Sequence, residues 1–154
     1  MRGVRNTGDG IRVLDLPAPE PTGDQVRVRV AAAGICGPDL HLLSWGPMPT
    51  TLGHEIAGHL DDGTPVAIEP VHRCGTCESC LRGDTHLCRT AQTIGIGLDG
   101  GMADELVVPP ECVVSLPDGL AVGDASLVEP VACAVRSLHR ARVESGQRVA
   151  VVGG

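Results

Sequence analysis

Four cysteines in one short segment constrain this chain most, because two-residue gaps let neighbouring thiolates converge on one point. Cys74, Cys77, Cys80 and Cys88 follow the spacing Cys-x2-Cys-x2-Cys-x7-Cys. Four thiolates form the closed tetrahedral shell of a structural zinc ion, and such an ion can fold a polar segment that has little core of its own. We therefore predict a zinc-stapled lobe over residues 71–90.

An iron–sulfur cluster is the sharpest alternative for this run of cysteines, and a redox dithiol or free thiols are two others. In the bacterial ferredoxin motif the last gap is three residues and a proline follows the fourth cysteine. Here the last gap is seven residues and Arg89 follows Cys88. The spacing therefore favours zinc.

A second group of metal-competent side chains comes from two separate segments. His54 and Glu55 stand between Gly53 and Gly58, and Cys36 lies eighteen residues upstream of the histidine. A His-Glu pair between glycines is, by itself, typical of a turn or strand end. Thiolate, imidazole and carboxylate together suit zinc, and three protein ligands with an open fourth position mark a catalytic site. The trio therefore predicts a catalytic zinc site.

Length and composition limit the remaining possibilities. The 154 residues provide one domain, and its core must be built from Val, Leu, Ile and Ala because Phe and Tyr are absent. A net charge of −7 without a basic cluster argues against a nucleic-acid partner. No stretch reads as a signal peptide or approaches a membrane span, so we predict no membrane partner and a cytoplasmic location with reduced cysteines.

Short strands bounded by Gly or Pro recur along the chain. Residues 25–30 alternate clearly, with valines on one face and arginines on the other, and this strand ends just before Cys36. Further strands are expected around Val4, at 11–14, 56–60, 66–68, 93–96, 106–108 and 112–116, with tight turns at 8–10 and 61–63. This pattern predicts a barrel or sandwich. Apolar residues at helical spacing then predict a helix over 127–143.

The chain closes on an apolar run at 149–152 followed by two glycines. A parallel strand buried on both faces and running into a phosphate-binding turn has this form, although any buried strand could end in the same way. Only Gly153 can match the first glycine of the Gly-x-Gly-x-x-Gly fingerprint. We expect a strand here.

Taken together, these motifs resemble one known family. Gly-Ile-Cys-Gly-x-Asp-x-His at 34–41, Gly-His-Glu at 53–55 and the four-cysteine spacing are similar to the medium-chain, zinc-dependent alcohol and polyol dehydrogenases. The resemblance runs from Val4 to Gly154. It implies a mainly β, GroES-like, barrel-shaped catalytic domain over 1–146 with its zinc lobe and a C-terminal helix. It also implies that 147–154 is the first strand of a truncated Rossmann domain, the nucleotide-binding domain.

The resemblance implies a role for each site residue. Cys36, His54 and Glu55 would hold a catalytic zinc, and the four cysteines a structural one. The resemblance marks four other positions, and each has an ordinary explanation as well. Glu129 is either an acidic residue at or near the metal or a first-turn helix carboxylate, and Asp39 either orients the zinc-bound histidine or is a solvated loop acid. His41 either ends a proton relay or is a surface residue, and Gly153 either binds the cofactor phosphate or only ends a strand.

The chain departs from the family pattern at Pro38. Members carry Ser or Thr two residues after the ligand cysteine, where the hydroxyl passes the alcohol proton outward. Proline has no hydroxyl, so the proton must leave through water, His41 or a carboxylate, or else the activity is altered. Cys112 and Cys133 fit neither ligand set and are expected to be buried free thiols, and Trp45 is expected in the wall of the substrate cleft or in packing.

The implied function is zinc-dependent hydride transfer from a secondary alcohol, polyol or sugar to NAD or NADP. Glu-Pro pairs at 69–70 and 129–130 favour polyol-type members. The full-length enzyme is expected to be a homo-oligomer, and the fragment itself to be inactive. The alternative is a zinc-stapled binding or assembly module without catalytic activity. The number of bound metal ions separates the two hypotheses, since the enzyme needs two zinc ions and the module one.

Overall fold

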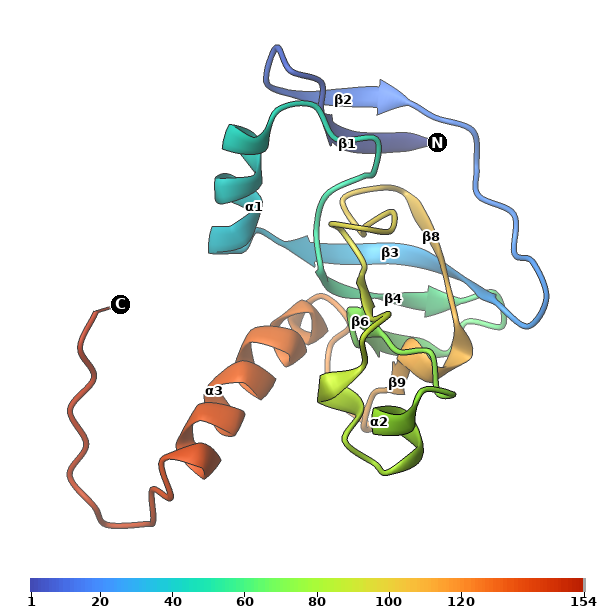
Figure 1. The fold of residues 1–154 in the computed structure, drawn as a ribbon. Helices are drawn as coiled ribbons and strands as arrows, with labels where there is room; N and C mark the ends of the chain where they lie inside the picture. Colours follow the sequence, from blue (N-terminus) through green and yellow to red (C-terminus); the bar gives the residue numbers. More distant parts are fainter. Residues whose placement is uncertain (154) are drawn as a thin grey trace.

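The structure, a computed structural model, describes residues 1–153 and is built on one five-stranded sheet (Figure 1). All pairings in this sheet are antiparallel, and the strand order is β8-β3-β4-β5-β9. Its strands are β3 (Val26–Gly34), β4 (Glu55–Leu60), β5 (Pro65–Ile68), β8 (Glu105–Val108) and β9 (Val113–Ser115). The expected mainly β architecture is confirmed.

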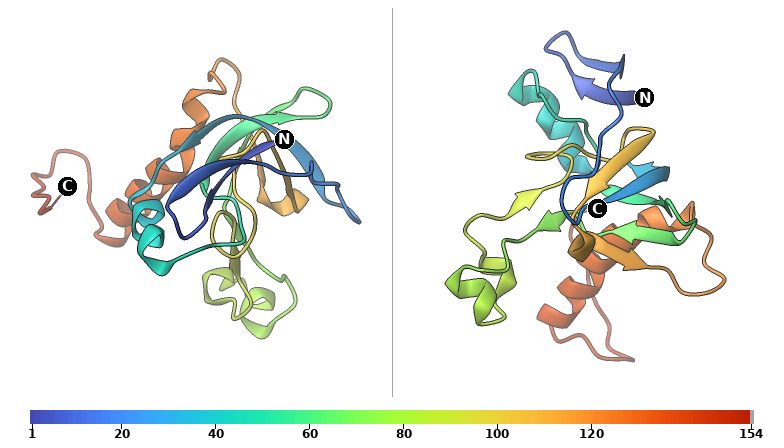
Figure 2. Two further views of the ribbon diagram at one scale, coloured as in Figure 1. Left: turned by 90° about the horizontal axis from the view of Figure 1, so that it is seen from above. Right: turned by 90° about the vertical axis from the view of Figure 1, so that its right-hand side faces the viewer.

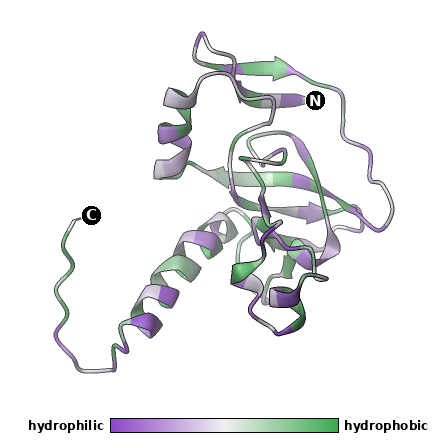
Figure 3. Cartoon of the chain, viewed as in Figure 1, coloured by the Kyte–Doolittle hydropathy of each residue, from purple (hydrophilic) through white to green (hydrophobic). Residues whose placement is uncertain are grey.

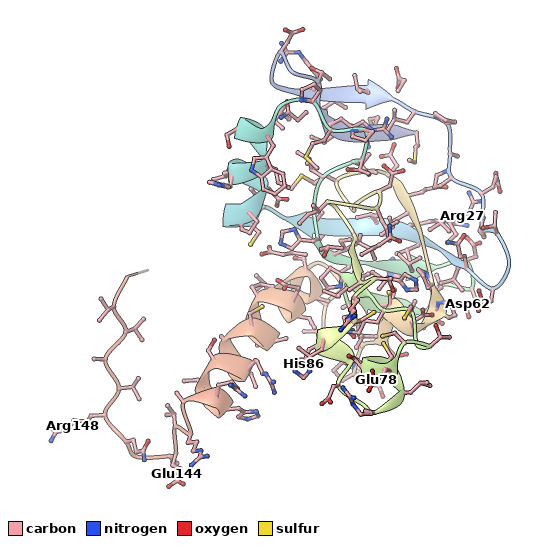
Figure 4. The ribbon with its side chains drawn as sticks, in the orientation of Figure 1. Arg27, Asp62, Glu78, His86, Glu144 and Arg148 are labelled. Carbon is pink, nitrogen blue, oxygen red and sulfur yellow. The ribbon has the colours of Figure 1, made fainter. Side chains whose placement is uncertain are left out.

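The core lies on one face of this sheet because β3 alternates as its sequence predicts. Val28 is fully buried and Val26 and Val30 pack against the core, while Arg27 points outward (Figure 4). Arg27 pairs there with Glu20 and Glu105, each at 2.8 Å. Burying one aliphatic side chain contributes about 1.5–3 kcal/mol. The buried core residues are Val28, Ile56, Val66, Ile68, Ile94, Leu106, Val108 and Cys112.

Two small antiparallel pairs accompany the main sheet. The predicted N-terminal hairpin is confirmed as β1 (Arg2–Asn6) and β2 (Ile11–Asp15), and β6 (Val71–His72) pairs with β7 (Gln92–Thr93). The expected strand over 93–96 is wrong. The chain instead turns after Thr93, whose carbonyl accepts the Gly97 N–H at 2.9 Å, and Gly95 has a φ of +82°.

The helices are short except for the last one, and Figure 2 shows them around the sheet. The α-helices are α1 (Gly37–Leu42), α2 (Glu78–Leu81) and α3 (Val128–Arg140). The 3-10 turns are η1 (Leu43–Trp45), η2 (Thr85–Leu87), η3 (Pro110–Cys112) and η4 (Asp124–Leu127). Among residues 1–153, every helix is too short or too polar to cross a membrane.

Helix α3 begins one residue later and ends three residues earlier than predicted. Pro130 is tolerated because it lies in the first turn, where its missing N–H has no helical partner. None of the helix residues is buried, and its apolar Val131, Val135 and Leu138 are 55%, 43% and 47% exposed. The apolar face that marks this helix in the sequence is therefore not covered by the described part of the chain.

The expected strand over 149–152 is not formed in the structure. Val151 and Val152 are 85% and 98% exposed, and this hydrophobic segment extends away from the sheet, as do the labelled Glu144 and Arg148 (Figures 3 and 4). A strand of this kind forms only between neighbouring strands, and residues 1–153 supply none beside it. Gly154 lies outside the described residues, so the nucleotide-binding assignment of 147–154 stays a prediction.

Candidate functional site

The backbone brings Cys36, His54 and Glu55 together from two neighbouring strands. Cys36 lies between the end of β3 and the first turn of α1, and Glu55 opens β4 directly opposite Gly34 of β3. One potential ligand atom from each of the three lies within 4.8 Å of the other two. His54 and Glu55 are each only 7% exposed, so these side chains are held by the surrounding structure.

Gly34 makes room for the Glu55 carboxylate. A Cβ atom at this position would lie 1.9 Å from Oε2 of Glu55 and 3.0 Å from its Cδ. Any other residue would therefore displace the carboxylate from its present place. The first glycine of the Gly-Ile-Cys-Gly motif is therefore required because it leaves space for the Glu55 carboxylate.

Hydrogen bonds fix the chain just before His54. The Thr51 carbonyl accepts the Gly100 N–H at 2.9 Å, and the Leu52 carbonyl accepts the Met102 N–H at 2.8 Å. Gly53 has a φ of +92°, and a Cβ there would meet Met102 at 2.6 Å. Only glycine fits this bend, which delivers His54 to the start of β4.

Asp39 lies behind both Cys36 and His54. Its Oδ2 accepts the backbone N–H of Cys36 at 2.9 Å, and its Oδ1 lies 3.5 Å from Nδ1 of His54. Among residues 1–153, neither this Oδ1 nor this Nδ1 has a hydrogen-bond partner, and both atoms are buried. A carboxylate beside one imidazole nitrogen orients a metal-bound histidine, which would bind the metal through Nε2.

The electrostatics of the trio favour a cation. Burial raises the pKa of the Cys36 thiol, and the neighbouring Glu55 carboxylate raises it further. No cationic side chain of residues 1–153 pairs with Glu55. A divalent cation would relieve this repulsion, and a Cys, His and Glu donor set fits zinc.

Glu129 is not part of this close trio. It lies in the first turn of α3 and accepts a hydrogen bond from the Cys133 thiol at 3.3 Å. Its assignment at or near the metal stays a prediction. Cys133 itself is exposed, so its expected burial is wrong, because no described element covers this part of α3. Cys112 is buried as expected.

Pro38 lies beside an apolar cavity of about 360 Å³. His41 supplies its one titratable side chain and is exposed, so it connects this cavity with solvent. Trp45 forms part of the wall and is 65% exposed, and its role in a substrate cleft stays a prediction. The cavity is lined by Gly37, Pro38, His41, Leu42, Trp45 and Ile96.

The four cysteines of the lobe also converge, with one sulfur from each lying within 4.8 Å of the others. The Sγ atoms of Cys74 and Cys88 are 3.6 Å apart. A hydrogen bond from the Thr90 hydroxyl is the largest of several that lower the pKa of Cys74 to about 5. Burial and the neighbouring thiols raise the pKa of Cys80 to about 12. Packed sulfurs of this kind fit a tetrahedral metal site. The lobe carries Glu78 and His86 (Figure 4).

A larger cavity of about 650 Å³ lies between α3 and the end of β5. Its wall includes Glu69 and Arg73 on one side, and Glu129 and Arg136 on the other. Sequence reasoning missed Arg136 as a cavity residue. The available signal was its position seven residues after Glu129, since residues at i, i+4 and i+7 share one helix face.

Comparisons with known proteins agree with this geometry. The Alcohol dehydrogenase GroES-like domain family matches residues 22–118. Galactitol 1-phosphate 5-dehydrogenase of Escherichia coli K12 is 34% identical over 99% of this chain and 49% of its own length. The chain therefore spans about half the length of such curated relatives.

Solved structures of dehydrogenases are also similar to this chain. An alcohol dehydrogenase from Escherichia coli CFT073, complexed with NADH, has a TM-score of 0.85 at 29% identity, over 92% of this chain and 46% of its own. A zinc-binding dehydrogenase from Sinorhizobium meliloti 1021, bound to NADP, has a TM-score of 0.82 at 33% identity, over 90% and 45%.

Proposed function

The chain belongs to the zinc-type, medium-chain alcohol and polyol dehydrogenase family, and on that premise we propose that it forms the metal- and substrate-binding part of a dehydrogenase. The enzyme transfers a hydride from a polyol or another secondary alcohol to NAD or NADP. One observation carries the proposal: ligand atoms of Cys36, His54 and Glu55 lie within 4.8 Å of one another beside the buried Asp39.

The residues of the chain have distinct roles in this proposal. Cys36, His54 and Glu55 would hold a zinc ion that supplies Lewis-acid chemistry, and a nicotinamide cofactor would supply the hydride-accepting group. Asp39 fixes the Cys36 backbone and the His54 ring, so the protein orients two ligands through one buried carboxylate. The four cysteines of the lobe hold a second, structural zinc.

The alcohol proton leaves by a route without the usual hydroxyl. Pro38 occupies that position and offers no proton, whereas His41 lines the same cavity and reaches solvent. An imidazole exchanges protons near neutral pH. We therefore assign the last step of proton release to His41, with water between it and the metal site.

A polyol substrate is favoured by the carboxylates of the larger cavity, because Glu69 and Glu129 can accept hydrogen bonds from several hydroxyl groups. The galactitol 1-phosphate dehydrogenase relative acts on such a molecule, and solved relatives hold NADH or NADP. Gly153 would be the first glycine of the cofactor-binding turn. A cytoplasmic, homo-oligomeric enzyme completes the proposal, and seven free cysteines suit a reducing compartment.

The decisive experiment observes His54 itself. Long-range ¹H–¹⁵N spectra of the zinc-loaded chain should show Nε2 of His54 bound to metal and Nδ1 protonated, and the metal-bound Nε2 signal should be absent from the zinc-free chain. His139 on α3 lies outside both ligand groups and is the internal control, so its ring-nitrogen signals should be the same with and without zinc. Ring-nitrogen signals of His54 that do not change at saturating zinc would contradict the proposal.

A further inference from the structure

We propose that the cavity between α3 and the end of β5 selects a hydroxylated substrate that carries an anionic group, a phosphate or a carboxylate, at the end of its carbon chain distant from the metal. The inference rests on the proposed function, because it names the substrate class of that same site. The residue that carries it is Arg136, which lines the cavity, is exposed to solvent, and has no ion-pair partner among residues 1–153.

The charges of the cavity are separated along its length. Glu69 forms an ion pair with Arg73, which also donates to the Val71 carbonyl at 3.1 Å, so this pair is internally neutral. Glu129 lies in the first turn of α3, the helix that contacts β4. Within residues 1–153, no carboxylate lies within 4.0 Å of the Arg136 guanidinium. In the proposed function Glu129 marks the metal end of the cavity, and the unpaired Arg136 lies further along the same helix.

Helix geometry sets the distance between these two ends. At about 1.5 Å per residue, the seven residues from Glu129 to Arg136 span about 10 Å along the axis of α3. This is roughly the extended length of a chain of about five or six carbons that ends in a phosphate or carboxylate. A cavity of about 650 Å³ has the size of a small-molecule site. A substrate hydroxyl at the metal would thus place the anionic group at Arg136.

The chemistry of the guanidinium group supports an anionic ligand over a neutral one. Its planar fork of N–H donors matches phosphate and carboxylate, and such charge-assisted hydrogen bonds are stronger than those to a hydroxyl. The pyrophosphate of a dinucleotide offers similar chemistry, so the test must separate the two sources.

The test uses NMR titration of the zinc-loaded chain with mannitol 1-phosphate, with mannitol and with ADP-ribose. Mannitol 1-phosphate should shift the amide signals of residues 132–137 and bind about tenfold more tightly than mannitol. Arg136→Gln should remove most of that preference, and Arg136→Lys should restore part of it. Arg140→Gln is the matched control, since Arg140 is exposed on the same helix outside the cavity lining, and should change nothing.

Several results would overturn this inference. Equal binding of the two polyols, no binding of either, or equal effects of the Arg136 and Arg140 substitutions would each do so. Tighter binding of ADP-ribose that depends on Arg136 would assign the guanidinium to the cofactor instead. All of these results leave the proposed function standing while zinc remains at the Cys36 site. Loss of that zinc from the wild-type chain would instead refute the proposed function.

Discussion

Replacing Gly34 by alanine should weaken metal binding at Cys36 without affecting the lobe. The new Cβ would lie 1.9 Å from Oε2 of Glu55, whereas ordinary contact begins at 3.4 Å, so the oxygen must move by about 1.5 Å. Zinc ligand distances tolerate only about 0.2 Å. We expect zinc affinity at this site to fall about 10–100-fold, or about 1.4–2.8 kcal/mol.

Competition with a chromophoric chelator measures this change, because it resolves tight and weak zinc sites in one titration. Gly37→Ala is the matched control in the same loop, since a Cβ at Gly37 meets no atom within 4 Å and its φ is not in the left-handed region. The control should bind zinc like the wild-type chain. Unchanged zinc affinity in Gly34→Ala would show that the position of Glu55 does not determine metal binding.

Four further predictions concern other parts of the molecule. Cys88→Ser should release the lobe zinc and remove amide-exchange protection across residues 71–90, because α2 and η2 are only single turns. Loss of protection in β3 as well would contradict a lobe that unfolds independently. Burial raises the pKa of Cys112 from 9.0 to about 11, so its contribution to stability is complete below pH 9 and is lost as the pH rises to about 11. The melting temperature should therefore fall more steeply between pH 9 and pH 11 in the wild-type chain than in Cys112→Ala. Parallel slopes in the two proteins would refute the role of the Cys112 thiol. The sequence has no Lys or Tyr that would titrate over the same range. The isolated chain should form no NAD(P)H from polyols, because positioning the nicotinamide is worth about 7–11 kcal/mol of the reaction barrier. In an enzyme completed with a cofactor domain, Pro38→Ser should raise turnover where proton release limits the rate. An unaffected pH profile would mean that His41, a carboxylate or water already carries the proton.

Features that depend on local chemistry could be predicted from the sequence. The Val and Arg alternation of β3 and the turn at 61–63 produce the expected strands, because each follows from side-chain period and turn residues. The four cysteines of the lobe converge because their gaps are short. The ligand chemistry of Cys36, His54 and Glu55 predicted a zinc site, but the Gly34–Glu55 register that joins these residues is a tertiary property that the sequence does not give.

Features that depend on neighbours in space could not be predicted. Ile94 is buried in the core, yet it leaves the strand because Gly95 turns the backbone. The apolar segment at 149–152 has strand propensity but no adjacent strand among residues 1–153. Cys133 is exposed although its helix is amphipathic, because residues 131–140 of α3 are all exposed in the described part of the chain, which helical periodicity alone does not reveal.

The number of zinc ions per chain tests the central claim most directly. Native mass spectrometry of the zinc-loaded chain should give two zinc ions, one held by the four cysteines and one by Cys36, His54 and Glu55. Cys36→Ser should retain only the lobe zinc, with the sheet still folded. One zinc ion in both proteins would contradict the dehydrogenase account and favour a zinc-stapled module without catalytic activity.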